Sequence, residues 1–130
     1  MKVSVIIPTR NEEASIGNCI NSLLRQTEKP YEIIVADYES TDGTPEIAER
    51  FLVTLEKYKV LRLKQHGIGY AREMARRECG GDIILSTDAD CVFSYDFIER
   101  ALRWFRNPRV LMVCGAEVPK EISPESIVCS

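Results

Sequence analysis

Two acidic residues, Asp88 and Asp90, follow almost directly after the apolar run Ile83–Leu85. The run predicts a buried strand, so the acids should stand where that strand leaves its sheet. In extended backbone, residues two apart face the same side. Two carboxylates on one side form a hard-oxygen site suited to Mg²⁺ or Mn²⁺ shared with substrate phosphates. The alternative is a solvated turn whose second acid helps to start the next helix, since short acidic pairs also recur by chance.

Alternating apolar segments predict the elements that position these acids. Strands are expected at residues 3–7, 31–37, 60–63, 82–87 and 110–116, and helices at about 16–24, 44–55, 67–79 and 94–105. The strand runs are continuously apolar, as in strands covered on both faces. Strands that alternate with helices of this length imply right-handed crossovers. The chain is therefore expected to be an α/β protein with a mostly parallel sheet of about five strands and helices on both faces.

In open α/β sheets, ligands bind beyond the carboxyl ends of the strands. The polar residues expected at those ends are Thr9, Arg10, Asn11, Glu12 and Glu13, then Asp37, Glu39 and Asp42, then Gly67, Gly69 and Arg72, and finally Asp88 and Asp90. Like charges gathered in this way are unfavourable unless a cation neutralises them. A divalent metal bound to a diphosphate would neutralise the negative charges gathered at such an edge.

Composition narrows the class of protein. The chain has 130 residues, 45% hydrophobic and 28% charged, which fits one domain with an ordinary core. The net charge of −3 disfavours a nucleic-acid binder. The sequence shows neither an apolar run of about 20 residues nor a signal peptide, so we expect a cytoplasmic location, with the cytoplasmic face of a membrane as the alternative. Its five cysteines include no Cys-x-x-Cys pair, which disfavours a zinc site or a disulfide framework.

Four motifs, in order, resemble those of family 2 glycosyltransferases with the GT-A nucleotide-binding fold. They are Val5–Glu13, Ile33–Asp37 with Ser40–Thr44, Gly67–Arg72, and Gly81–Asp90. The resemblance covers about residues 3–117. It implies an enzyme that moves a sugar from a nucleotide-diphosphate donor to an acceptor hydroxyl of a glycan, lipid or protein, with inversion and with Mn²⁺ or Mg²⁺ as cofactor.

The resemblance also implies roles for particular residues. The nucleoside pocket would be lined by Pro8, Thr9, Arg10 and Glu12. Asp37 would contact the base or ribose, and Arg72 would contact the base or a phosphate. The sugar nucleotide would be contacted by Asp88 and Ala89, and the metal would be bound by Asp90 with Asp88. The residues themselves leave other interpretations open. Asp37 could form a turn, Arg72 could be a solvated helix residue, and Glu12 and Glu13 could favour the start of a helix through its dipole.

The chain departs from the family pattern at several positions. Tyr38 and Glu39 stand where the family commonly has a second acid and a glycine, and Cys91 stands where a third acid often follows. We expect residues 1–118 to form the nucleotide-sugar-binding domain, and residues 119–130 to be a tail or the start of an acceptor-binding half that would supply the still unassigned catalytic base. The alternative function is a catalytically incomplete nucleotide-sugar-binding module. Association with a membrane surface and with a second copy both stay open.

Two other metal-using classes fit less well. A nucleotidyltransferase would want glycine and lysine in the first loop, and residues 8–13 contain neither. A receiver domain would want a lysine after its fifth strand, and residues 110–116 contain none.

Overall fold

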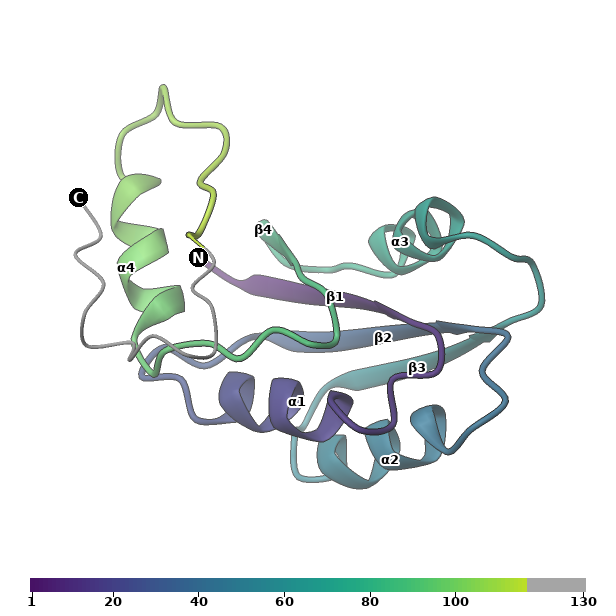
Figure 1. Ribbon diagram of the computed structural model, residues 1–130. Helices are drawn as coiled ribbons and strands as arrows, with labels where there is room; N and C mark the ends of the chain where they lie inside the picture. The colour runs from purple at the N-terminus through teal and green to yellow at the C-terminus, as the bar shows by residue number, and fades with distance from the viewer. Residues whose placement is uncertain (117–130) are drawn as a thin grey trace.

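The computed structural model describes residues 1–116, in which four strands alternate with four helices (Figure 1). The strands are β1 (Val3–Thr9), β2 (Glu32–Tyr38), β3 (Tyr58–Leu63) and β4 (Ile83–Ser86). The helices are α1 (Ile16–Leu24), α2 (Thr44–Leu52), α3 (Ile68–Arg77) and α4 (Phe97–Trp104). No helix in this part of the chain is long and apolar enough to cross a membrane.

The four strands form one parallel sheet in the order β3-β2-β1-β4. Its register sets Thr9 beside Asp37 and Ile6 beside Ser86. Because all strands run in one direction, their carboxyl ends share one edge of the sheet, here called the carboxyl edge, where Thr9, Tyr38, Leu63 and Ser86 end their strands. The α/β architecture with a parallel sheet is thus confirmed.

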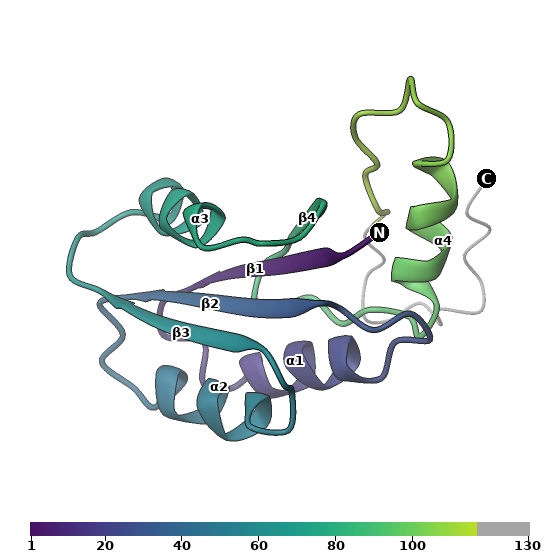
Figure 2. The ribbon, with the colours of Figure 1, turned by 180° about the vertical axis from the view of Figure 1, so that it is seen from behind.

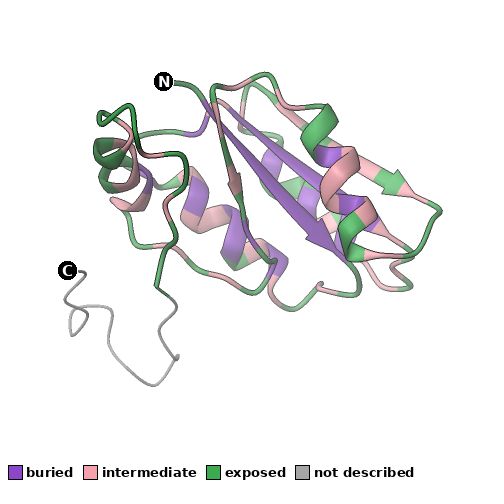
Figure 3. Cartoon of the chain, turned by 90° about the horizontal axis from the view of Figure 1, so that it is seen from above, coloured by how far each residue is buried: buried purple, intermediate pink, exposed green. Residues whose placement is uncertain are grey.

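Helices cover both faces of the sheet, as the apolar runs predicted. Figures 1 and 2 show α1 and α2 on one face and α3 on the other. On the first face, Val5 and Ile7 of β1 pack in a cluster with apolar residues of α1 and α2. On the second face, Ile6 packs in a smaller cluster with Ala71 and Ala75 of α3. The central strands β1 and β2 are therefore buried almost throughout (Figure 3).

Helix α4 lies at the opposite end of the molecule from the carboxyl edge, beyond the carboxyl end of α1. The buried side chain of Gln26 holds α4 in this position through two hydrogen bonds. Its Nε2 donates to the Ser94 carbonyl (2.6 Å), and its Oε1 accepts from the Ile98 amide (3.0 Å). The chain after the acidic pair thus turns away from the carboxyl edge and runs back to the amino ends of the strands.

The prediction of a fifth strand at residues 110–116 is wrong. Among the described residues the sheet has four strands, and this segment has no regular structure. Leu111 and Met112 are 91% and 78% exposed. After the turn beyond α4, the segment runs back beside α4 toward the start of β1 (Figure 1), and Gly115 lies against the Phe97 ring. An apolar run becomes a strand only when a neighbouring strand offers backbone partners, and β4 pairs with β1 alone in the described residues. Residues 119–130, expected to be a tail or the start of an acceptor-binding half, lie outside the described residues.

Candidate active site at the carboxyl edge

Thr9 and Asp37 meet at the carboxyl edge because β1 and β2 pair in the register that sets them side by side. The Thr9 hydroxyl donates to Asp37 Oδ1 (2.8 Å), and the Ser40 hydroxyl donates to the same oxygen (2.5 Å). Asp37 is only 4% exposed. Every buried side-chain nitrogen or oxygen in residues 1–116 has a hydrogen-bond partner. Because Oδ2 of Asp37 has no protein partner there, this second oxygen must reach solvent.

Pro8 is buried in β1 opposite Ala36 of β2. A proline in an inner strand is unusual, because it cannot donate to the sheet ladder. Backbone groups of residues two apart point the same way along a strand, and the Ile6 carbonyl accepts from Thr87 on the β4 side. The absent N–H of Pro8 therefore points past the end of β4, where no strand needs it.

The loops that follow β1 and β2 are joined by reciprocal hydrogen bonds. The Asn11 amide donates to Ser40 Oγ (2.9 Å), and Asn11 Oδ1 accepts from the Thr41 amide (2.8 Å). Asn11 adopts a left-handed conformation with φ 53°, which asparagine tolerates better than most residues. The preceding Arg10 is exposed.

Further along the same two loops, Glu12 and Glu13 bond with the start of α2. The Glu12 amide donates to Thr44 Oγ1 (2.8 Å), and Glu13 Oε2 accepts from the Gly43 amide (2.8 Å). The Glu12 carboxylate also accepts from Ser15, the residue before α1 (2.9 Å). Glu12 is thus used at least partly to start a helix, which was the alternative interpretation of this residue.

Asp42 completes this connection between the loops. It accepts from the Thr44 amide (3.0 Å), from the Thr44 hydroxyl in a short bond and from the Glu13 amide (3.3 Å). Burial alone would raise the pKa of Asp42, but these hydrogen bonds outweigh it and lower the pKa. The charged form of Asp42 therefore holds the two loops together.

The positions that depart from the family pattern form a second contact. Glu39 takes the left-handed conformation with φ 58°, which a glycine would adopt more easily. Its Oε1 lies 2.8 Å from His66 Nδ1, and the Tyr38 ring packs edge-on against the His66 ring with centroids 5.6 Å apart. The loop after β2 is thereby fastened to the segment that leads into α3.

Arg72 of α3 reaches the end of β4. Its Nη2 donates to Asp88 Oδ1 (2.6 Å), and its Nη1 donates to Ser86 Oγ (2.7 Å). The structure thus brings Arg72 and Asp88 together at the carboxyl edge, although Asp88 stays half exposed.

The acidic pair lies in a turn and not in extended backbone, so the argument from an extended chain is wrong here. Strand β4 ends at Ser86, and the Cys91 amide donates to the Asp88 carbonyl (3.2 Å). The buried Ala89 anchors the turn in the core, so its side chain faces away from solvent. The thiol of Cys19 on α1 also donates to the Asp88 carbonyl, at 3.7 Å. Burial, with Cys91, Asp90 and Asp88 nearby, raises the pKa of Cys19 to about 12.

Asp90 is exposed, and no basic side chain pairs with it within residues 1–116. No cluster of three or more metal-binding side chains occurs among these residues either. A protein site with only one or two carboxylates still fits Mn²⁺ or Mg²⁺, because Mg²⁺ commonly takes its remaining ligands from water and substrate phosphates. The donor set therefore fits a cation that arrives with a phosphorylated substrate.

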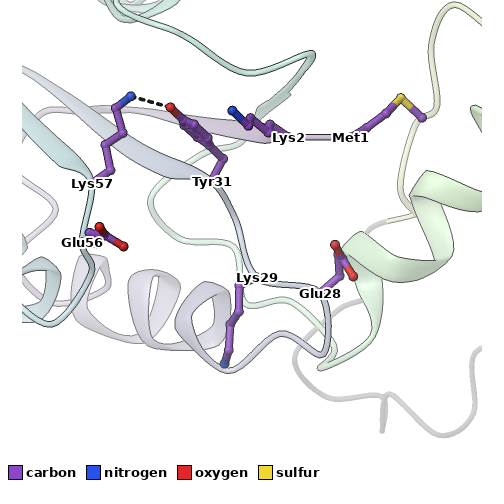
Figure 4. Close-up of a pocket in the computed structure, with 7 residues that line it drawn as sticks. All are labelled: Met1, Lys2, Glu28, Lys29, Tyr31, Glu56 and Lys57. Atoms are coloured by element: carbon purple, nitrogen blue, oxygen red, sulfur yellow. Dashed lines mark hydrogen bonds between the residues drawn. The ribbon is translucent and has the colours of Figure 1, made fainter.

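A pocket of about 640 Å³ lies elsewhere, near the amino ends of the strands (Figure 4). It is lined by Met1, Lys2, Glu28, Lys29, Tyr31, Glu56 and Lys57. Lys57 Nζ donates to the Tyr31 hydroxyl (2.6 Å) in this pocket. None of the residues predicted for donor binding lines this pocket.

The family model for glycosyl transferase family 2 matches residues 4–125. A poly(ribitol-phosphate) beta-N-acetylglucosaminyltransferase of Staphylococcus aureus, TarS, is 37% identical over 139 aligned positions, which cover 96% of this chain and 24% of that protein. An uncharacterized glycosyltransferase of Bacillus subtilis, YfnE, is 34% identical and is matched over 88% of this chain and 30% of its own length.

Solved structures agree with this assignment. The TarS structure in complex with UDP-GlcNAc superposes with a TM-score of 0.76 at 30% identity, over 92% of this chain and 37% of that one. A mannosyltransferase from Pyrobaculum calidifontis, solved with GDP-Man and Mn²⁺, gives a TM-score of 0.77 at 31% identity, over 84% of this chain and 33% of its own. The chain thus spans about a third of the length of these relatives. With its parallel sheet and its match over nearly all residues, the chain belongs to glycosyl transferase family 2.

Proposed function

We propose that this chain is the donor-binding part of an inverting glycosyltransferase, and that it binds a nucleotide-diphosphate sugar with Mn²⁺ or Mg²⁺ at the carboxyl edge. The main support is that Asp37, Arg72 and Asp88 come from three separate elements and gather at this one edge. The metal-bound and sugar-nucleotide-bound structures of two similar enzymes support the class of ligand.

The geometry supports a separate contact with the donor for each predicted residue. The outward Oδ2 of Asp37 is free to accept from the base or ribose, while Thr9 and Ser40 hold Oδ1. Pro8 is buried next to the last residue of β1, and Arg10 and Glu12 lie on the loop that follows β1. The side chain of Ala89 points into the core, so the backbone of the turn would make its contact with the donor.

The diphosphate leaves with increasing negative charge, and a divalent cation held by Asp90 and Asp88 would stabilise that charge as a Lewis acid. Arg72 adds a fixed positive charge beside the same turn. An acceptor hydroxyl would attack the anomeric carbon in line, with inversion, and would need a general base to take its proton. No residue of 1–118 is assigned as that base; residues 119–130 would be either a tail or the start of an acceptor-binding half that supplies it.

A second candidate is a module that holds the donor without completing transfer, because the residues gathered at the carboxyl edge are assigned to donor and metal binding and none is assigned as a general base. The two candidates share the donor site and differ only in turnover. Both predict that a donor and a metal together stabilise the folded chain, because ligands that bind only the folded form raise its stability.

A thermal shift experiment tests the shared step. The chain is melted with UDP- and GDP-sugars, each with and without Mn²⁺, and we expect the full shift only when donor and metal are both present. Absence of a shift with every donor would refute the donor site. Release of nucleoside diphosphate in the presence of candidate acceptors would then distinguish the enzyme from the binding module.

A further inference from the structure

Ser86 lies at the carboxyl edge, inside the Gly81–Asp90 motif, but the family resemblance assigns it no role. It is the last residue of β4, whose side chains alternate between the two faces of the sheet. Ile83 and Leu85 pack into the cluster beneath α1 and α2. Ile84 and Ser86 therefore face the side on which α3 lies, and both are exposed.

Helix α3 packs over β1 and β2, and its buried residues Ala71 and Ala75 contact those strands. To reach the end of β4, α3 has to use a long side chain, and Arg72 is that side chain. Its guanidinium donates through Nη1 to Ser86 and through Nη2 to Asp88, at 2.7 and 2.6 Å. A guanidinium is planar and rigid, so fixing one terminal nitrogen also fixes the direction of the other.

We propose that Ser86 is a positioning residue for the donor site: by accepting from Arg72 Nη1 it aims Nη2 at Asp88 and so holds the acidic turn ready for the metal-bound donor. This inference rests on the proposed function. The backbone of the turn is already held, because the Asp88 carbonyl accepts from Cys19 and from Cys91. The Arg72–Ser86 contact adds the remaining restraint, on the carboxylate itself.

Only Oδ1 of Asp88 is used by Arg72, and Oδ2 has no protein partner within residues 1–116. The half-exposed carboxylate thus keeps one oxygen for a ribose hydroxyl or a metal. Without Ser86, Arg72 would still carry its charge, but its partly exposed side chain would sample several rotamers. Binding would then have to order both Arg72 and Asp88, and affinity would fall.

The test is titration calorimetry with UDP and GDP in saturating Mn²⁺. Ser86→Ala should weaken binding by about five- to tenfold, the cost of ordering one long side chain when the ligand binds. Ser86→Thr, which keeps the hydroxyl, should restore most of the affinity. Ser94→Ala removes an exposed hydroxyl far from the edge and is the matched control. The melting temperatures without ligand should agree among the four proteins, since Ser86 is exposed.

A double-mutant cycle supplies the decisive comparison. If Ser86 acts through Arg72, Ser86→Ala should add little to Arg72→Ala, because the partner is already gone. Additive losses, or wild-type affinity in Ser86→Ala, would overturn the inference while leaving the donor site intact. A wild-type chain that binds neither nucleotide in Mn²⁺ would instead overturn the proposed function, and this inference with it.

Discussion

Replacing Asp37 with asparagine separates the structural use of this carboxylate from its proposed use in donor binding. Asparagine has nearly the same shape, and its carbonyl oxygen can accept from the Thr9 and Ser40 hydroxyls as Oδ1 of Asp37 does. The outward oxygen becomes an amide nitrogen, which donates and cannot accept. The change therefore removes the group that would meet the donor and keeps the group that holds the fold.

The expected sizes of the two effects differ. Both internal hydrogen bonds lose their charge assistance, which should lower the free energy of unfolding by about 1 kcal/mol and the melting temperature by about 3–5 °C. A hydrogen bond from a ligand to a charged acceptor contributes about 1.5–3 kcal/mol, or about 10- to 150-fold in affinity. We therefore expect a folded variant with greatly weakened donor binding.

The assay is titration calorimetry with UDP and GDP in Mn²⁺, together with a melting curve for each protein. Asp82→Asn is the matched control, because Asp82 precedes β4 at the opposite edge and accepts from the Lys2 amide. It loses the same charge at a distance from the site. If Asp37→Asn melts normally and binds as tightly as Asp82→Asn, the outward oxygen has no part in donor binding and the reasoning fails.

Three further changes test other parts of the structure. Asp90→Asn should leave the melting temperature without ligand unchanged but abolish the extra shift that Mn²⁺ gives to a donor, and a persisting metal dependence in the thermal shift would contradict the metal role. For the buried Glu32, burial alone would raise the pKa, but hydrogen bonds from the Gly80 amide and the Ser4 hydroxyl outweigh it and lower the pKa from 4.5. Because the pKa of Glu32 is lower in the folded state, its charged form stabilises the fold above pH 4.5. The difference in melting temperature between wild type and Glu32→Gln should therefore shrink as the pH falls below 4.5. A difference that stays constant would argue against this reasoning. Gly81→Ala should lower the free energy of unfolding, measured by denaturant titration, by about 1–3 kcal/mol, because the new Cβ would stand 2.6 Å from Ser4 Oγ. In the control Gly80→Ala, the new Cβ meets nothing closer than 3.7 Å, so this change should be nearly neutral. Equal effects of the two substitutions would refute the clash.

Several residues of the site could be placed from the sequence because their positions follow from strand ends. Thr9 ends β1 and Asp37 is the last residue but one of β2, and parallel neighbours bring such ends together. Arg72 was expected near the acidic pair for the same reason. The roles of these residues in donor binding stay predictions, which the experiments above address.

Other parts of the site could not be predicted. Asn11 bonds with Ser40 and Thr41, which are 29 and 30 residues away in the chain. The run Ser40–Thr44 is rich in turn-forming residues, which is the only signal that the sequence offers here, and such composition does not identify partners in another loop. Ser86 likewise has no sequence feature that distinguishes it from other strand residues, and its contact with Arg72 depends on how α3 packs on the sheet.

Two expectations failed for a common reason. An apolar pattern shows that a face will be buried, but it does not show what will cover it. Residues 110–116 have the composition of a strand but find no strand partner among the described residues. Trp104 on α4, a large aromatic residue of the kind that usually packs in a core, is 61% exposed, because α4 lies at the end of the molecule and only its Ile98 is fully buried.

Periodicity, turn residues and four ordered motifs were sufficient to establish the α/β class, the parallel direction of the strands and the membership in glycosyl transferase family 2, because these depend on local pattern and chain order. Packing alone determined that β4 stops at Ser86, that the acids sit in a turn, and that one guanidinium links Ser86 with Asp88. Such contacts depend on side chains that meet across elements, and their geometry exists only once the sheet and α3 have come together.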